Sequence, residues 1–159
     1  MPEFSLDTTW KIPAPLERVW DCLIDTASWP LWWPYVVTVE ELAANGNDKS
    51  RIDDRRRYQW LTCLPYKLTL DIRLTRYEPC SLIDVEVLGD LKGYGNCRLS
   101  VEPLTSSTVV CFKWNVRTCK PWMNRFSPLL RPVFIWNHNR VMRQGETGLI
   151  KYLNFQRKS

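Results

Sequence analysis

His138 is the only histidine of the 159-residue chain, and histidine is the side chain best suited to proton transfer near neutral pH. It shares one stripe of a predicted C-terminal helix with Phe134 and Met142, so its side chain is expected to face inward. Two interpretations stay open: a general acid or base, or a neutral core histidine hydrogen-bonded between helix and sheet. The catalytic residue is therefore unknown, with His138 as the candidate. The neighbouring Asn137 and Asn139 are predicted to point about 100° away from it.

Three consecutive arginines, Arg55 to Arg57, form the second candidate for chemistry. Strand alternation would place Arg56 on the same face as Tyr58 and Trp60. If that face lines a cavity, the Arg56 guanidinium could hold a ligand carboxylate, phenolate or enolate through paired hydrogen bonds. The favoured alternative is an exposed charge paired with one of the two aspartates that precede the arginines. The sequence leaves the direction of these side chains open.

Aromatic residues are abundant, with nine Trp, six Tyr and five Phe. Such side chains can form walls around a planar ligand, or they can simply fill a core. The candidate walls are Trp33, Tyr66, Trp114, Trp122 and Trp136. Trp114 is the strongest of them, because it lies on the apolar face of a strand expected to run beside the C-terminal helix. Trp136 is the weakest, since it lies about 200° around that helix from Phe134.

Metal, nucleotide and disulfide motifs are lacking in the sequence. The six cysteines include no C-x-x-C pair and accompany a single histidine, so we expect reduced, buried thiols and no metal site. The glycine-rich stretch from Gly89 to Gly95 leads into a strand and lacks the third glycine of a dinucleotide-binding loop. A hairpin turn and a bulge are expected there instead. We expect no cofactor.

The net charge of +5 and the pI near 9.0 reflect a moderate excess of basic residues. Without a polybasic tail, nucleic-acid binding is not expected. The first residues form no apolar signal segment. The longest uncharged stretch, Thr26 to Val39, contains two prolines and is too short for a transmembrane helix. The sequence therefore predicts a cytoplasmic protein without a transmembrane segment; its oligomeric state stays open.

The hydrophobic periodicity predicts the elements that must position these residues. A first strand covers residues 3–12 and a helix runs from Pro15 to about Asp25, followed by a short helical turn that Ser28 could cap. Six strands follow, at residues 35–43, 51–61, 66–77, 81–88, 94–102 and 107–118. Helical periodicity returns from Pro121 to Phe155, with prolines limiting its unbroken part to residues 133–153.

This order of elements predicts one α+β domain over residues 1–159. In it, a curved antiparallel sheet of about seven strands wraps around the long C-terminal helix, with two short helices between strands one and two. A twisted sheet that closes on a helix along one line leaves a gap elsewhere. The apolar strand faces, including Ile83 to Val87, Cys97 to Val101 and Val110 to Val116 on alternate positions, should line this gap.

Three segments carry a resemblance to a known family: Ile12 to Trp20, Trp29 to Pro34, and Pro121 to Leu153. In order and spacing they resemble the START-like helix-grip (SRPBCC) superfamily, in particular its polyketide cyclase/dehydrase-like branch. The resemblance covers nearly the whole chain. It implies a helix-grip fold with an internal cavity, in a superfamily whose members bind lipids, hormones and aromatic polyketides, catalyse cyclisation and dehydration, or bind proteins.

The leading hypothesis is that the cavity binds a small apolar, aromatic or lipid-like molecule. An aromatase/cyclase-type enzyme that uses His138 is the second hypothesis. The third is a protein-interaction module with a collapsed cavity and an exposed Trp29 to Pro34 segment. The expected ligand-binding residues are Trp33, Tyr58, Trp60, Tyr66, Leu70, Val87, Leu99, Phe112, Trp114, Phe134, His138 and Met142.

Overall fold

The computed structural model describes residues 3–43, 51–62 and 67–158. Seven antiparallel strands form one sheet in the order β1-β7-β6-β5-β4-β3-β2. The strands are β1 (Glu3–Ile12), β2 (Val36–Ala43), β3 (Arg55–Leu61), β4 (Lys67–Glu78), β5 (Leu82–Gly89), β6 (Leu91–Val101) and β7 (Thr108–Thr118). The helices are α1 (Leu16–Ile24), the short 3-10 helix η1 (Thr26–Ser28), α2 (Trp29–Trp32), α3 (Pro121–Arg125) and α4 (Ser127–Lys158). The helix-grip fold and the sheet expected from the sequence are confirmed.

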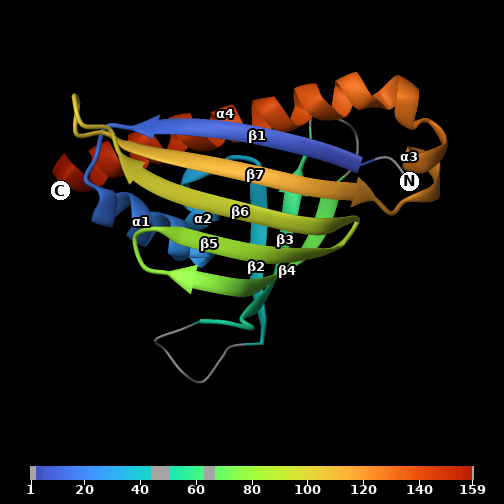
Figure 1. Cartoon of the computed structure of the whole chain (residues 1–159), viewed down its shortest axis with the longest axis horizontal. Coiled ribbons are helices and arrows are strands. Elements are labelled where there is room, and N and C mark those ends of the chain that lie inside the picture. The colour runs from blue at the N-terminus through green and yellow to red at the C-terminus, as the bar shows by residue number, and fades with distance from the viewer. Residues whose placement is uncertain (1–2, 44–50, 63–66, 159) are drawn as a thin grey trace.

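The sheet is strongly curved. β2 to β7 follow one another as a meander, and β1 pairs with β7, so the first and last strands are neighbours. In Figure 1, β1, β7 and β6 run across the view, whereas β2 and β3 run nearly at right angles to them. α4 lies along the concave side of this sheet, and α1 and α2 close one end. This arrangement encloses the region where the candidate site lies.

Two strand boundaries differ from the prediction by more than one residue. The strand predicted at 51–61 begins only at Arg55, because Arg51 and Asp53 adopt positive φ angles of 50° and 70° in a turn. β6 begins three residues early, at Leu91, so Asp90 alone separates β5 from β6. Gly93 permits this: its φ is +153°, and a Cβ there would lie 1.9 Å from the carbonyl oxygen of Asn115.

The N-terminal helices fold as predicted except at their junction. α1 buries Val19, Trp20 and Leu23 on one face. Ser28 does occupy the N-cap position of α2, but its hydroxyl makes no capping bond. The hydroxyl instead donates to the carboxylate of Asp25 at 2.6 Å, so the predicted cap is wrong.

The C-terminal helix is longer than predicted. α4 begins at Ser127 and continues through Pro132, whereas the unbroken part was expected to begin at residue 133. Pro128 lies in the first turn, where no intrahelical donor is required. Pro132 lacks the N–H that would bond the carbonyl of Pro128, but both prolines are exposed, so water can reach that carbonyl. α3 is a separate short helix before it.

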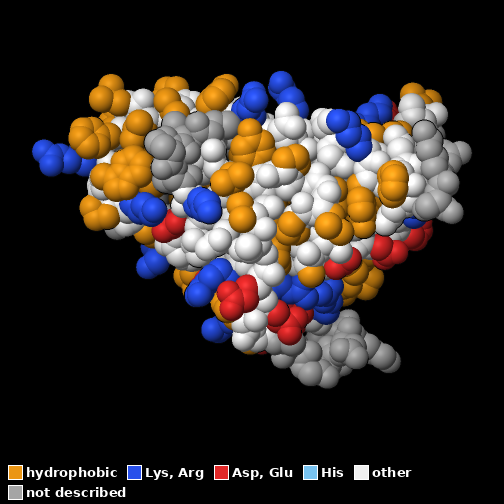
Figure 2. Space-filling view, turned by 180° about the vertical axis from the view of Figure 1, so that it is seen from behind, with side chains coloured by type: hydrophobic (Ala, Val, Ile, Leu, Met, Phe, Trp, Pro, Cys, Tyr) orange, Lys and Arg blue, Asp and Glu red, His pale blue; other side chains and the backbone are white. Residues whose placement is uncertain are grey.

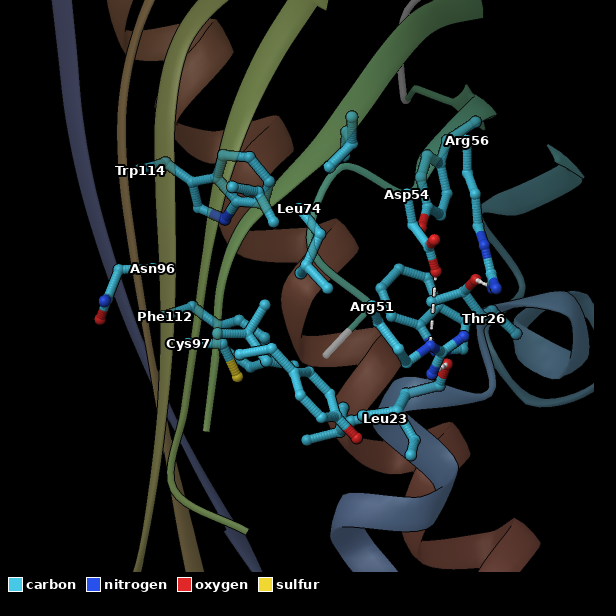
Figure 3. Close-up of a pocket in the computed structure, with 17 residues that line it drawn as sticks. Leu23, Thr26, Arg51, Asp54, Arg56, Leu74, Asn96, Cys97, Phe112 and Trp114 are labelled. Atoms are coloured by element: carbon cyan, nitrogen blue, oxygen red, sulfur yellow. Dashed lines mark hydrogen bonds and ion pairs between the residues drawn. The ribbon is translucent and has the colours of Figure 1, made fainter. Parts of the chain in front are cut away.

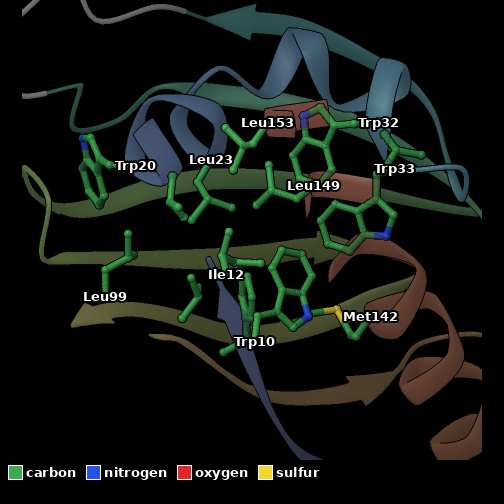
Figure 4. Packing of buried hydrophobic residues seen from close by; sticks show 14 of the residues in the cluster. Trp10, Ile12, Trp20, Leu23, Trp32, Trp33, Leu99, Met142, Leu149 and Leu153 are labelled. Carbon is green, nitrogen blue, oxygen red and sulfur yellow. The ribbon is translucent and has the colours of Figure 1, made fainter. Parts of the chain in front are cut away.

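The core lies between the sheet, α1, α2 and α4 (Figure 4). Trp10 packs edge-on against Trp33, with ring centroids 5.2 Å apart. Gly145 of α4 makes room for these rings, since a Cβ there would lie 2.5 Å from the Trp33 ring. Gly148 makes room for the backbone of α2, since a Cβ there would lie 1.8 Å from the carbonyl oxygen of Trp32. α4 can therefore approach α2 more closely than side chains would permit. Val101, expected inside, is instead 49% exposed near the end of β6.

None of the described helices combines enough length with enough apolar character to span a membrane.

Candidate functional site

Two adjoining chambers lie between the sheet and the helices. The smaller has a volume of about 120 Å³ and the larger about 160 Å³. Both walls include the same four side chains: Trp29, Ile72, Phe112 and Trp114. The chambers are thus two parts of one mostly apolar cavity, and each has about the volume that holds a single benzene-sized ring.

The larger chamber lies between the sheet and the first half of α4. Phe134, Asn137 and His138 face it from α4, and Met123 faces it from α3. Trp60 on β3 and Trp114 on β7 belong to its walls as well. Residues three, four, seven and eight positions apart lie on one face of a helix, and this spacing places the α4 side chains together.

Two residues that line this chamber have buried nitrogen atoms without a hydrogen-bond partner. Neither ring nitrogen of His138 nor the indole nitrogen of Trp60 has a hydrogen-bond partner among the described residues. Burial lowers the pKa of His138, and the nearby Asn139 side chain opposes this only in part. His138 is therefore neutral at pH 7, with one ring nitrogen able to donate and the other able to accept. A buried polar atom without a hydrogen-bond partner costs free energy, so binding of a molecule that supplies such partners would be favoured.

The smaller chamber has a polar side and an apolar side, as Figure 3 shows. On the polar side, Arg56 donates to the hydroxyl of Thr26, and Arg51 pairs with Asp54 at 3.5 Å. Trp114, Phe112 and Cys97 lie across from them. Arg56 and the exposed Glu41 are 3.8 Å apart.

The structure shows the directions of two of the three consecutive arginine side chains, Arg56 and Arg57. Arg56 lies on the same face as Tyr58 and Trp60, as the alternation predicts, and it is mostly buried. Its partners are Thr26 and Glu41, so the favoured pairing with a preceding aspartate is wrong. Arg57 lies on the opposite face, where it forms a two-bond ion pair with Asp71 at 2.7 and 3.0 Å.

Two further groups of the smaller chamber have shifted pKa values. Burial raises the pKa of Tyr58, against the opposing effect of the Thr26 hydroxyl, so its phenol stays protonated. Burial raises the pKa of the Cys97 thiol to about 12. Neither group is an activated nucleophile at neutral pH. Within the described ranges, no cluster of three or more His, Cys, Asp or Glu residues could hold a metal ion.

The structure brings together most of the residues proposed from the sequence. Those that line one or both chambers are Trp33, Tyr58, Trp60, Leu70, Phe112, Trp114, Phe134, His138 and Met142. Val87 and Leu99 are buried but line neither chamber, and Val87 instead borders a separate surface hollow beside β1. Tyr66 lies outside the described residues. Trp122 and Trp136 are exposed and line neither chamber.

Sequence reasoning missed Asn137 and Trp29. Asn137 was predicted to point away from His138, yet it is buried and lines the same chamber. Its spacing of three residues from Phe134 is the signal that could have found it. Trp29 belongs to both chamber walls and donates its indole N–H to the carbonyl of Cys22 at 3.3 Å. The aromatic run at 29–33 marked this region, but nothing in its spacing singles out Trp29.

Solved structures of several other proteins share this fold. An aromatase/cyclase, ZhuI from Streptomyces sp. R1128, is 14% identical, with a TM-score of 0.75 over 95% of this chain and 93% of that one. A START superfamily protein from Mycobacterium smegmatis is 15% identical, with a TM-score of 0.74 over 96% and 98%. A protein from Thermus thermophilus is 17% identical, with a TM-score of 0.71 over 95% and 99%. At these identities the likeness shows the fold alone.

Comparison of sequences gives the family. No curated protein matches the chain. A family profile described as polyketide cyclase / dehydrase and lipid transport matches residues 3–153, which include every strand, the chambers and most of α4. The fold, the cavity between sheet and helix and this match over nearly the whole length agree, and the chain belongs to the polyketide cyclase/dehydrase and lipid transport family.

Proposed function

We propose that the protein binds one small, largely apolar molecule, aromatic or lipid-like, in the two-chambered cavity between the sheet and α4. The observation that carries this proposal is the cavity itself, with walls of Trp29, Phe112 and Trp114 and space for about one ring in each part. Burial of apolar surface supplies about 25 cal/mol per Å² of driving force. Flat side chains favour a flat ligand.

The unsatisfied nitrogens of the larger chamber narrow the ligand class. The indole N–H of Trp60 and one ring N–H of His138 call for oxygen acceptors, and the other His138 nitrogen calls for a donor. A phenolic or keto-phenolic ring system supplies both kinds of group. An unsubstituted hydrocarbon would leave all three nitrogens without partners, and so should bind less tightly.

Arg56 supports an additional anchor at the polar side of the smaller chamber. Its guanidinium is held by Thr26 and faces the chamber. A ligand long enough to reach from the larger chamber could place a carboxylate, phenolate or enolate there. This anchor would compete with Glu41, which is exposed and 3.8 Å away.

The proposal is tested by native mass spectrometry of gently purified protein, compared with its denatured mass. We expect a co-purified adduct of small mass. Titration with 2-naphthol and with naphthalene gives a second measurement: saturable binding is expected for both, and tighter binding for 2-naphthol. A protein that is empty and also binds neither probe would overturn the proposal.

One observation favours a second candidate, an aromatase/cyclase-type enzyme. This function requires His138 to reach the cavity, and His138 lines the larger chamber as a neutral imidazole. It could move a proton while the walls fold a flexible poly-β-keto chain. Turnover of such a substrate by the protein, and its loss in His138→Gln with binding retained, would establish it. Unchanged turnover in that variant would exclude His138.

The interaction-module hypothesis has less support. It requires a filled cavity and an exposed aromatic segment. Both chambers are present, and Trp32 and Trp33 are buried at 4% and 2% exposure.

A further inference from the structure

A long part of the chain carries positive charge without any negative charge. Residues 103–145 contain no Asp or Glu, but they contain seven basic residues: Lys113, Arg117, Lys120, Arg125, Arg131, Arg140 and Arg143. The rest of the chain has 15 Lys and Arg against 17 Asp and Glu, so this segment holds the whole positive excess. It forms β7, α3 and the first half of α4.

Large apolar side chains are exposed on the two helices of this segment. Trp122 and Phe126 are 43% and 48% exposed at α3, and Leu129 and Trp136 are 78% and 53% exposed on α4. Leu129, Trp136 and Arg143 are seven residues apart, so they form one stripe on the side of α4 opposite Phe134 and His138. Single exposed apolar residues are ordinary, but a stripe continuous with a second exposed pair marks an interaction surface.

The α3–α4 face, as we name it, combines these apolar side chains with exposed arginines. Its members are Trp122, Arg125, Phe126, Leu129, Trp136, Arg140 and Arg143. In Figure 2, where the α3 end lies on the left, hydrophobic side chains gather over this end with Lys and Arg among them. Arg125 and Arg143 form no ion pair within the described part of the chain.

The acidic groups near this face are few. Asp90 lies 3.7 Å from Lys120, and its carboxylate also accepts from the backbone N–H of Thr69. Glu3 shares a surface hollow with Arg117 and Arg131 at the start of β1. Neither carboxylate lies on α3 or α4. Glu146 of α4 accepts from the backbone N–H of Lys11 at 2.9 Å. The charges of Arg125 and Arg143 therefore stay available for a partner.

We propose that the α3–α4 face binds the surface of an anionic lipid bilayer. Exposed Trp and Phe beside Arg suit the membrane interface, where apolar rings enter the headgroup region and cations meet anionic headgroups. A second copy of the chain is a poorer partner, because a two-fold contact would bring arginines opposite arginines. A nucleic acid would use the charges but would leave the aliphatic Leu129 unmatched.

The short helix α3 borders both the α3–α4 face and the larger chamber, and this arrangement does not require a bound ligand. α3 presents Trp122 to the outside and Met123 to the larger chamber. A bilayer bound to the α3–α4 face would therefore lie against the outer side of a chamber wall. Loss of cavity binding and loss of membrane binding are nevertheless separate results, because different side chains are involved.

The experiment is vesicle flotation of the full-length protein at about 0.1 M salt, with phosphatidylcholine vesicles or vesicles containing about one-third phosphatidylglycerol. We expect flotation with the anionic vesicles only, weakened by added salt. Neutralising both Arg125 and Arg143 to Gln should lower partitioning roughly thirty-fold, or about 2 kcal/mol for two basic side chains near the surface. The double variant Leu129→Ala, Trp136→Ala should also lower partitioning to the anionic vesicles.

The matched controls are Lys151→Gln, an exposed cation in the second half of α4, and Leu104→Ala, an aliphatic side chain 93% exposed between β6 and β7. Both should partition like the parent protein, and all variants should keep the parent melting temperature. Absence of flotation with anionic vesicles would overturn the proposal. Equal losses in the controls, tighter binding to a DNA oligonucleotide at the same salt, or a dimer that hides this face in sedimentation would also overturn it.

Discussion

The indole N–H of Trp33 donates a hydrogen bond to the backbone carbonyl of Val141 across 2.8 Å, with the ring 2% exposed. This bond joins the end of α2 to the middle of α4, and its two residues are 108 positions apart in the sequence. It therefore helps to fix the position of α4, and with it that of His138.

Replacing Trp33 with Phe should destabilise the fold by about 2 kcal/mol, because it removes this bond, leaves the Val141 carbonyl buried and creates a small void. Urea unfolding would measure the change. Trp136→Phe is the matched control: its ring is 53% exposed, and the change should stay within about 0.5 kcal/mol. Equal effects would contradict the role given to the Trp33 bond.

Gly148→Ala should destabilise the protein by about 1–3 kcal/mol, although alanine favours helices, since its Cβ would collide with the Trp32 carbonyl oxygen at 1.8 Å. The adjacent Thr147 is exposed, so Thr147→Ala should be neutral or slightly stabilising. Thermal melting of both variants would test the close contact of α4 with α2. A Gly148→Ala variant as stable as the parent would show that α4 can move away without cost.

Trp114→Ala should weaken binding of 2-naphthol roughly tenfold or more, because Trp114 lines both chambers and its ring supplies much apolar contact area. Trp136→Ala, on the outer side of α4, should leave the affinity unchanged. Isothermal titration with the soluble probe measures both. Similar losses in the two variants would contradict the assignment of the cavity walls.

Acid should destabilise the parent protein through His138. The pKa of this residue is lowered in the folded state, so the unfolded chain binds the proton more readily as the pH falls through the unfolded value near 6.5. The free energy of unfolding should therefore fall below that pH, and His138→Gln should remove this part of the decrease. Urea midpoints at about pH 8 and about pH 5 for both proteins give the comparison. An unchanged pH dependence in the variant would show that the imidazole takes up its proton without cost.

Cys97 should react very slowly with iodoacetamide. With a pKa of about 12, against an ordinary value of 9.0, its thiolate fraction at about pH 8 is lower by roughly a thousandfold. Cys119, which follows β7 and is partly exposed, provides the internal comparison. Peptide mapping after timed alkylation would measure the two rates. Rapid labelling of Cys97 in the native protein would mean that the smaller chamber opens to solvent.

The sequence predicts most of the fold because its signals are local. Period-two alternation in β4 and β7, and the spacing of Val19, Trp20 and Leu23 in α1, report directly which face each element buries. The seven-strand meander then follows from short connections. Pro132 was misleading, because an exposed proline near the start of a helix costs less than one in its middle.

The cavity could be predicted only in part, since it depends on how distant side chains share space. Phe134, His138 and Met142 follow from one helical stripe, and Arg56 follows once Tyr58 is known to face inward. Val87 shares its strand face with Val85, yet only Val85 lines a chamber, and no period in the sequence distinguishes the two. The orphaned nitrogens of His138 and Trp60 are equally invisible, because a missing partner is a property of the assembled structure.

The four side chains common to both chambers have a consequence for selectivity. A molecule bound in one chamber would contact side chains that also line the other, so two small ligands are expected to affect each other's affinity, and by an equal factor in both directions. A single longer molecule that reaches both chambers would avoid this mutual effect. The shared walls should therefore select ligands by length as well as by chemistry.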